Sequence, residues 1–405
     1  MFNCHKVIKA VWVPVAALAI LSSASAAPVA GKVEVAAYYF GNYHQDRRNE
    51  AFHGKGWNEW KLVKEAKPRF EGHYQPRVPV WGYEDEADPQ AMARKIDAAA
   101  KYGVDAFIFD WYYYEDGPFL ERSLDEGFLN APNNDKVKFA LMWANHDWTD
   151  IHPKRRAVKK PQLLYPGKVS PEQFDRICDL VIARYLKHPS YWKIGGKPYF
   201  SIYELPKFLE NFGGSADAAK SALERFRKKA VAAGLPGLHL NTIYCGQRIL
   251  PQETAIKDVF ELTKFLGFDS ATSYTWLHHV EMTDLTTKFD FVRDGYLADW
   301  AGLLKRFRIP YIPNASVGWD SSPRADQRDE YGNFGYPFCS VIVDNGPDRF
   351  RAALLEIRRR LDADPSQLRI VTVNSWNEWT EGSYLEPDEK YGYGYLEAIR
   401  QVFGK

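Results

Sequence analysis

The chain has 405 residues, of which 53 are lysine or arginine and 52 are aspartate or glutamate, so its formal net charge is +1. This balance argues against a nucleic-acid or anionic-membrane partner, because such partners select a clear excess of basic residues. Aromatic residues make up 15% of the chain, with 13 Trp, 24 Tyr and 24 Phe, and this share favours a site that stacks on a ligand.

The first residues have the three parts of a secretory signal peptide. Lys6 and Lys9 form a basic n-region, residues 11–21 form an apolar core, and an Ala-Ser-Ala cleavage site follows. We therefore expect a signal peptide at 1–26, cleavage before Ala27, and a mature chain in the periplasm or outside the cell. The apolar stretch is too short to span a bilayer comfortably, so no stable membrane insertion is expected. The mature chain keeps three cysteines, whose wide spacing forms no zinc pattern and which we expect to be small buried hydrophobic side chains: Cys178, Cys245 and Cys339.

From residue 33 onward, short apolar runs rich in β-formers alternate with helical patterns. Eight such runs predict strands, at 33–41, 104–114, 138–146, 197–205, 237–246, 268–276, 309–319 and 368–379. Asp88-Pro89, Ser170-Pro171 and Gly346-Pro347 mark helix starts between them, because a cap residue followed by proline suits the first helical turn. Gly103 and Gly234 stand where helix ends favour glycine.

Strand-then-helix alternation repeated eight times predicts an α/β fold, a (β/α)8 TIM barrel. A doubly wound open sheet is the structural alternative. It requires a glycine-rich phosphate-binding turn after the first strand, and residues 40–49 (FGNYHQDRRN) offer none. No Pro-, Gly- or Ser-rich linker divides the chain, so we expect residues 27–405 to form a single barrel domain.

The tetrapeptide WNEW occurs twice, at 57–60 and at 376–379. The first copy lies in a long segment after the first strand (41–87), and the second ends the eighth strand. Further long segments follow the third strand (145–169) and the sixth (277–290). The loops after barrel strands build the site, and strands one and eight are neighbours, so both copies can reach the same mouth.

The end of the eighth strand carries the strongest candidates for catalysis. Because side chains alternate along a strand, Asn374, Trp376 and Glu378 are predicted to face the barrel axis. Glu381 follows three residues after Glu378, so the chain must bend after Trp379 for both carboxylates to share the mouth. Two carboxyl groups in one cleft suit acid–base chemistry on a glycosidic bond, in which one is protonated and the other ionised. The alternative is a solvated pair of glutamates on a loop.

Polar and aromatic side chains follow several other strands at the same level. Flat aromatic faces beside hydrogen-bonding groups match what sugar rings need. Glu59, on a long loop without strand geometry, is expected to bind sugar or lock the loop rather than to donate a proton. A divalent metal held by Asp110, Glu204 and Asp320 is a weaker alternative, and we expect no metal and no cofactor. The predicted substrate-binding residues are Tyr38, Tyr39, Trp57, Glu59, Trp60, Asp110, Trp111, Tyr112, Trp143, Asn145, His146, Tyr203, Glu204, Tyr274, Trp276, Trp319, Asn374, Trp376, Asn377, Trp379, Tyr384 and Glu386.

Two stretches resemble the WbsX-like group, which is related to glycoside hydrolase family 99. Residues 373–399 (VNSWNEWTEGSYLEPDEKYGYGYLEAI) resemble its closing signature, and 54–60 (GKGWNEW) its early motif. The resemblance extends over almost all of the mature chain. It implies a (β/α)8 barrel that cleaves internal α-mannosidic bonds with retention, using the substrate's own 2-hydroxyl as nucleophile through a 1,2-anhydro sugar. Matched onto NEWTEG, it implies Glu378 as the base toward that hydroxyl and Glu381 as the acid/base.

These observations predict an exported retaining glycoside hydrolase, endo-acting on a polysaccharide or oligosaccharide that contains mannose or a similarly configured sugar. Two alternatives remain: a transglycosylase or polysaccharide-biosynthesis enzyme that uses the same carboxylates, and a barrel that binds glycan without cleaving it. The sequence leaves open the sugar, its linkage and the oligomeric state.

Overall fold

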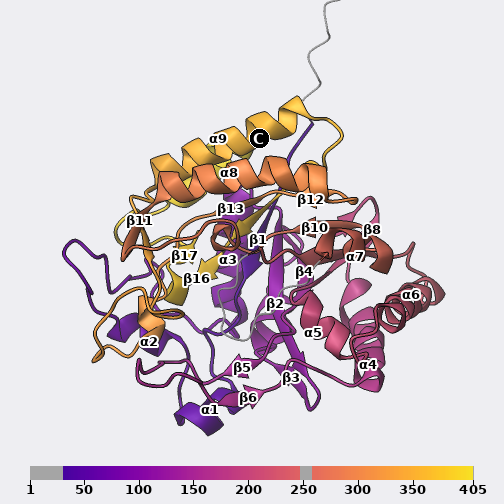
Figure 1. The fold of residues 1–405 in the computed structure, drawn as a ribbon, viewed down its shortest axis with the longest axis horizontal. Helices are drawn as coiled ribbons and strands as arrows, with labels where there is room; N and C mark the ends of the chain where they lie inside the picture. Colours follow the sequence, from indigo (N-terminus) through magenta and orange to yellow (C-terminus); the bar gives the residue numbers. More distant parts are fainter. Residues whose placement is uncertain (1–30, 247–257, 405) are drawn as a thin grey trace, which may run out of the picture.

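In the computed structural model, the described residues are 31–246 and 258–404. The predicted signal peptide at 1–26 lies outside them. Most strands of the central sheet run parallel and surround one axis, with helices outside (Figure 1). The fold is therefore an α/β barrel, as predicted.

Nine short parallel strands form the barrel, in the order β12-β10-β9-β8-β4-β2-β1-β15-β13. Their bounds are β1 Glu34–Tyr39, β2 Ala106–Tyr114, β4 Lys138–Trp143, β8 Lys197–Ile202, β9 His239–Ile243, β10 Ser270–Thr272, β12 Tyr311–Ile312, β13 Asn314–Ser316 and β15 Ile370–Asn374. Each predicted run contains a strand, and consecutive runs pair. The spatial order therefore follows the chain order, as a barrel requires.

The seventh predicted strand is split in two, and this split closes the barrel. Pro313 lies between β12 and β13 and has no N–H to donate to a ladder. β12 pairs with β10, whereas β13 pairs with β15. The Thr372 N–H donates to the Pro313 carbonyl at 2.9 Å, which joins the last strand to the interruption. The eight predicted strands thus appear as nine.

Helices cover the outside of the barrel (Figure 1). They are α3 Pro89–Tyr102, α4 Pro171–Val181, α5 Leu205–Glu210, α6 Ala216–Ala232, α7 Val259–Leu266, α8 Phe289–Arg306, α9 Pro347–Ala363 and α10 Gly394–Phe403, with π-helical turns η1 Ser123–Phe128 and η2 Ile182–Leu186. The three predicted starts are confirmed: Asp88 and Ser170 accept backbone N–H bonds as caps, and α9 begins at Pro347. Gly103 adopts the left-handed conformation at the end of α3, with φ 88°.

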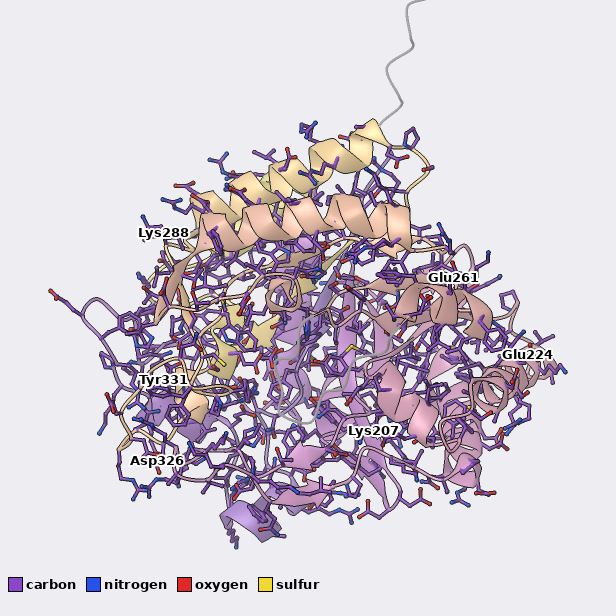
Figure 2. The ribbon with its side chains drawn as sticks, in the orientation of Figure 1. Lys207, Glu224, Glu261, Lys288, Asp326 and Tyr331 are labelled. Atoms are coloured by element: carbon purple, nitrogen blue, oxygen red, sulfur yellow. The ribbon has the colours of Figure 1, made fainter. Side chains whose placement is uncertain are left out.

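The segments after the strands carry short elements that shape the barrel mouth. They are α1 Arg47–His53, α2 Trp60–Glu65, β3 Gly117–Phe119, β5 Trp148–Thr149, β6 Leu163–Tyr165, η3 Trp276–His278, β11 Thr286–Lys288, η4 Ser322–Arg324, β14 Val341–Val343, β16 Asn377–Glu378, η5 Trp379–Glu381 and β17 Ser383–Tyr384; β7 Lys193–Ile194 pairs with β8 before its strand. A further long segment follows β13 (317–340) and was not among the long segments expected from the sequence. Asp326 and Tyr331 in this segment lie on the side of the molecule near α2 (Figure 2).

Two other sequence features can be compared with the described residues. Cys178 is a buried free thiol, as expected, whereas Cys245 and Cys339 are only partly buried, so the expectation of burial is wrong for these two. Among the helices at 31–246 and 258–404, none combines the length and apolar character needed to cross a bilayer.

Candidate active site

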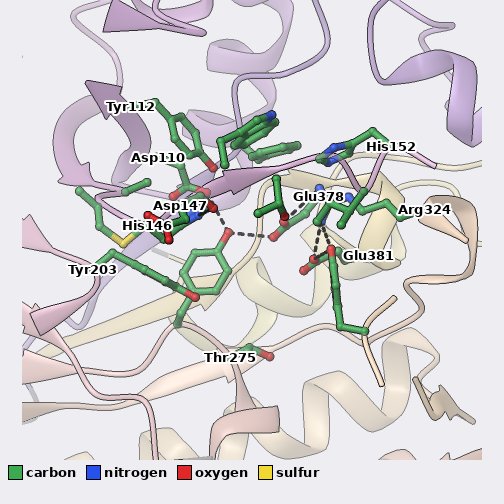
Figure 3. A pocket seen from close by; sticks show the side chains of 18 of the residues that line it. Asp110, Tyr112, His146, Asp147, His152, Tyr203, Thr275, Arg324, Glu378 and Glu381 are labelled. Carbon is green, nitrogen blue, oxygen red and sulfur yellow. Dashed lines mark hydrogen bonds and ion pairs between the residues drawn. The ribbon is translucent and has the colours of Figure 1, made fainter. Parts of the chain in front are cut away.

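A cavity opens at the carboxyl ends of the barrel strands, with an empty volume of about 680 Å³ that includes space open to solvent. Its lining includes these predicted site residues: Asp110, Tyr112, His146, Tyr203, Tyr274, Trp319, Glu378 and Glu381. It also includes side chains that the sequence analysis did not select, among them Phe40, Trp148, His152, Thr275, Arg324 and Tyr336 (Figure 3).

Glu378 and Glu381 reach this cavity through a bend in the chain. Glu378 ends β16, and the 3-10 turn η5 then carries the chain to Glu381. Gly382 follows with φ 63°, a conformation that glycine adopts without steric cost. The predicted bend after Trp379 is therefore present, and both carboxyl groups lie in one cavity with only 6% of each side chain exposed.

Arg324 places one guanidinium group among three buried carboxylates. Its Nη1 pairs with Oε1 of Glu381, and its Nη2 lies 3.7 Å from Oε1 of Glu378 (Figure 3). Its Nε donates to Oε1 of Glu59 at 2.7 Å. Tyr336 donates its hydroxyl proton to Oε1 of Glu381 at 2.8 Å. One guanidinium thus contacts three acidic side chains, so its single positive charge can neutralise only one of the three when all are ionised.

Glu59 fixes this guanidinium and links the two WNEW copies. Besides Arg324, it accepts hydrogen bonds from Asn42 Nδ2 and Thr380 Oγ1, each at 2.5 Å. Thr380 directly follows the second copy, and Trp60 of the first copy packs on Trp379 of the second, with ring centroids 5.7 Å apart. The two copies therefore support one site, and Glu59 acts as a locking residue behind the cavity.

Burial makes the acid forms of the central carboxyl groups more favourable. It raises the pKa of Glu378 well above its ordinary value, and the charge of Glu381 adds to this although Arg324 opposes it. Burial also raises the pKa of Glu381, but Arg324, the Tyr336 hydroxyl and a hydrogen bond with the Glu378 carboxyl limit the rise. Of the two, Glu378 is the better holder of a proton when no ligand is bound.

The walls of the cavity combine aromatic faces with buried polar atoms. Trp148 stacks on His152 at 5.1 Å, and burial lowers the pKa of His152 well below its ordinary value, so this ring is neutral. In the described part of the chain, the cavity residues with a buried polar atom that has no hydrogen-bond partner include Asp110 Oδ1, Thr149 Oγ1, His152 Nδ1 and Trp319 Nε1. An unsatisfied buried group costs about 1–3 kcal/mol, so these atoms favour a polar ligand.

Asp320 is a structural anion and not part of a metal site. Its Oδ2 accepts hydrogen bonds from His73 at 2.9 Å, Gln75 at 2.6 Å and Arg77 at 3.2 Å. Burial raises the pKa of Asp320, but the His73 hydrogen bond and the Arg77 charge outweigh this effect and hold the pKa below its ordinary value. Within residues 31–246 and 258–404, no group of three or more His, Cys, Asp or Glu is placed to hold a metal ion, and this includes the grouping of Asp110, Glu204 and Asp320.

Some predicted residues point into the helix layer, and the prediction that they face the mouth is wrong. Tyr39 donates to Glu86 beside α3, Trp111 packs on Tyr185 of η2, Trp143 on Phe174 of α4, Trp276 on Tyr296 of α8, and Trp376 on Phe107, which packs on Phe128 of η1. For Trp376 the reason is that β15 ends at Asn374, so strand alternation does not extend to it. For Tyr39, Trp111 and Trp143, alternation itself turns the side chain outward.

The remaining predicted residues lie behind the lining and hold it in place. Asn145 and Glu204 exchange two hydrogen bonds of 2.8 and 2.9 Å through their backbone and amide groups, which joins the ends of β4 and β8. Asn377 binds the backbone N–H and C=O of Phe40 at 2.8 and 2.7 Å. The others in this layer are Tyr38, Trp57, Glu59, Trp60, Asn374, Trp379, Tyr384 and Glu386, all of them buried.

Comparison with known proteins places the chain in a family. Residues 35–399 match the family described as "Glycosyltransferase WbsX". The chain belongs to the WbsX family. Two curated relatives, both described as "Uncharacterized protein WxcX" and from two strains of Xanthomonas campestris pv. campestris, are 28% identical over 378 residues, which is 90% of this chain and 49% of theirs. This WbsX chain thus spans about half the length of the curated relatives it matches.

Solved structures similar to this WbsX chain are glycoside hydrolase barrels. A family 99 (GH99) endo-α-mannosidase from Bacteroides thetaiotaomicron is 14% identical with a TM-score of 0.50, covering 92% of this chain and 96% of that one. A structure described as "Glycoside hydrolase-like protein" is 17% identical with a TM-score of 0.55, covering 92% and 94%. At this level of identity the similarity supports the barrel fold and not a shared substrate. The chain therefore has a glycoside hydrolase-like fold.

Proposed function

We propose that this WbsX protein is a retaining glycoside hydrolase that cleaves a mannose-containing or similarly configured polysaccharide internally. The observation that carries the proposal is the placement of Glu378 and Glu381 in one aromatic cavity, both in contact with Arg324. Aromatic faces and unpartnered polar atoms in the same lining suit the two sides of a sugar ring.

The closeness of the two glutamates favours retention over inversion. An inverting enzyme separates its carboxyl groups by about 6.5–9.5 Å so that a water molecule fits between them and the substrate. Here both carboxyl groups contact one guanidinium, Glu381 through Nη1 of Arg324 and Glu378 at 3.7 Å from its Nη2. Such a pair can act on neighbouring atoms of one sugar, as the substrate 2-hydroxyl mechanism requires.

In the proposed first step, Glu378 takes the proton of the substrate 2-hydroxyl while O2 attacks the anomeric carbon. The glycosidic bond breaks, and the leaving oxygen takes the proton of Glu381, which gives a 1,2-anhydro sugar and a free alcohol. In the second step, Glu381 takes a proton from water and the water oxygen bonds to the anomeric carbon. The bond between that carbon and O2 breaks, and O2 recovers its proton from Glu378. Each proton transfer can contribute about 10²–10⁴ in rate.

The test is product release by the full chain from α-mannans, bacterial exopolysaccharides and plant glycans. We expect oligosaccharides from one polymer, with a loss of at least about 10²-fold in the Glu381→Gln variant, because glutamine cannot donate the proton. Glu224→Gln is the matched control, since Glu224 is exposed on α6 (Figure 2) and should leave the rate unchanged.

Two other outcomes favour the competing activities. Transfer of the released sugar to an added acceptor, without free sugar, favours a transglycosylase and agrees with the WbsX description as a glycosyltransferase. Binding of one polymer by both wild type and Glu381→Gln, with no cleavage by either, contradicts hydrolysis and favours a glycan-binding barrel.

We also propose that the enzyme acts in the periplasm or outside the cell, on the strength of the basic and apolar N-terminal sequence. N-terminal sequencing of the protein from fractionated cells should give Ala27 as the first residue of the exported form. A cytoplasmic protein that still carries residues 1–26 would contradict this proposal.

A further inference from the structure

Tyr274 lies between two carboxyl groups and bonds to both. Its hydroxyl oxygen is 2.8 Å from Oδ2 of Asp110 and 2.8 Å from Oε2 of Glu378 (Figure 3). A phenol has one proton to donate, and an ionised carboxylate can only accept. Both contacts can be hydrogen bonds only if one of the two carboxyl groups carries a proton and donates it to the tyrosine oxygen.

The surroundings favour this shared proton. Burial raises the pKa of Asp110 well above its ordinary value, the Tyr274 hydrogen bond opposes the rise, and the charge of Glu381 adds to it. Burial and the charges of Asp110, Glu378 and Glu381 raise the pKa of Tyr274, so its phenol is neutral. The titratable and charged groups that act on Asp110 include Tyr38, Tyr112, Tyr274, Glu378 and Glu381. The others that line the same cavity are His146, Asp147, His152, Tyr203, His278, Arg324 and Tyr336.

We propose that Asp110, Tyr274 and Glu378 form a proton relay in which Asp110 stores the proton that Glu378 must release before it acts as a base. The proposal rests on the hydrolase function proposed above. In the transfer, the Glu378 O–H bond breaks and its proton bonds to the Tyr274 oxygen, while the Tyr274 proton passes to Oδ2 of Asp110. The net change moves one proton from Glu378 to Asp110 and leaves the total charge unaltered.

The position of Arg324 gives the transfer its direction. Glu378 lies 3.7 Å from the guanidinium, whereas Asp110 makes no ion pair with any described residue. Once a ligand excludes water from the cavity, Asp110 and Glu378 are therefore more stable with the negative charge on Glu378 and the proton on Asp110. The lower dielectric strengthens the attraction between Glu378 and Arg324, and it also increases the cost of a charge on Asp110. Asp110 acts through Tyr274 and is thus a positioning residue.

Infrared absorption of protonated carboxyl groups in the full chain, without substrate, tests the relay across mildly acidic to mildly alkaline pH. We expect Asp110 and Glu378 to lose their protons in two coupled steps. Asp110→Asn and Glu378→Gln should each leave a single step at lower pH, because the neighbouring charge is gone. Tyr274→Phe keeps the ring, removes both hydrogen bonds and should change the titration of both carboxyl groups at once.

Asp125 provides the matched control. Burial raises its pKa to about 6, and its Oδ1 accepts the Tyr185 hydroxyl at 2.8 Å, outside the lining of the cavity. Asp125→Asn should remove one titration step and leave the steps of Asp110 and Glu378 unchanged. An unchanged Glu378 titration in Asp110→Asn, or an Asp110 that is ionised throughout this range in the wild type, overturns the relay.

A kinetic measurement separates the relay from a purely structural role. On a glycan that the wild type cleaves, Asp110→Asn and Tyr274→Phe should lower kcat by about 10²-fold with little change in KM, and should move the acid limb of the kcat/KM profile. Cleavage without coupled titration overturns the relay and leaves the hydrolase function intact. Coupled titration with no cleavage of any glycan supports the relay and counts against the hydrolase.

Discussion

Lys95→Met is expected to lower the free energy of unfolding by about 3–5 kcal/mol, the cost of removing one partner from a buried ion pair. The Lys95 ammonium, on α3, lies 2.7 Å from Glu86 and 2.6 Å from Glu386, and only 2% of its side chain is exposed. Burial lowers the pKa of Lys95, but the charges of Glu386 and Glu86 outweigh this effect and hold the pKa above its ordinary value. Glu386 also accepts the indole N–H bonds of Trp376 and Trp379, at 2.9 and 2.7 Å. Denaturant titration at neutral pH measures the loss.

Two further variants separate the buried charge from the loss of a side chain. Lys101→Met changes an exposed lysine of the same helix and should cost no more than about 0.5 kcal/mol. Adding Glu86→Gln and Glu386→Gln to Lys95→Met removes the unpaired charges and should restore much of the stability. A cost below about 1 kcal/mol for Lys95→Met alone would show that the three charges do not stabilise the fold.

The barrel could be predicted from sequence because each of its units is local. An apolar run of strand length, a capped helix start and their alternation are all written in neighbouring residues. The split at Pro313 was less accessible, since whether a proline ends a strand or divides it depends on the strands that pair on either side. The sequence therefore predicted the run at 309–319 as a strand, but it did not predict that β12 pairs with β10 while β13 pairs with β15.

Alternation along a strand places cavity residues correctly only where the strand continues. Glu378 and Glu381 line the cavity, but the bend at η5 brings them there, because β15 ends at Asn374. Asp110 and Trp111 are neighbours on β2 and cannot face the same side, so placing both in the site broke the rule of alternation. Strict use of that rule selects Asp110, which lines the cavity, and rejects Trp111, which does not.

Arg324 was missed because nothing local marks it. It belongs to a polar segment that holds one other arginine and three aspartates, and only the folded chain brings it to Glu59, Glu378 and Glu381. The available signal was the length of the segment between the seventh strand and α9, since long loops after barrel strands are usually functional. That signal identifies a segment and cannot choose among its residues.

Replacing Arg324 by methionine is expected to lower kcat by about 10²–10³-fold, close to the full value of a proton-transfer group. Burial lowers the pKa of Arg324, but this effect is outweighed by Glu59, Tyr336 and both cavity glutamates. The pKa therefore lies well above its ordinary value, and the guanidinium is a permanent cation. Without it, the pKa of Glu378 and Glu381 loses the opposing effect of the guanidinium, so both carboxyl groups keep their protons to higher pH. The base is then lost, and the acid limb of the kcat/KM profile should move to higher pH.

Two control variants identify what the guanidinium supplies. Arg324→Lys keeps a positive charge but has one nitrogen in place of a fork that reaches three carboxylates, so it should recover only part of the activity. Arg324→Met combined with Glu59→Gln removes one buried charge and should recover folding stability, whereas the pH profile should stay displaced because Glu378 and Glu381 remain unpaired. Activity within about twofold of wild type in the folded Arg324→Met variant would mean that this cation does not set the ionisation of the glutamates. Full recovery by Glu59→Gln would instead assign the loss to misfolding of the loop that carries the first WNEW copy.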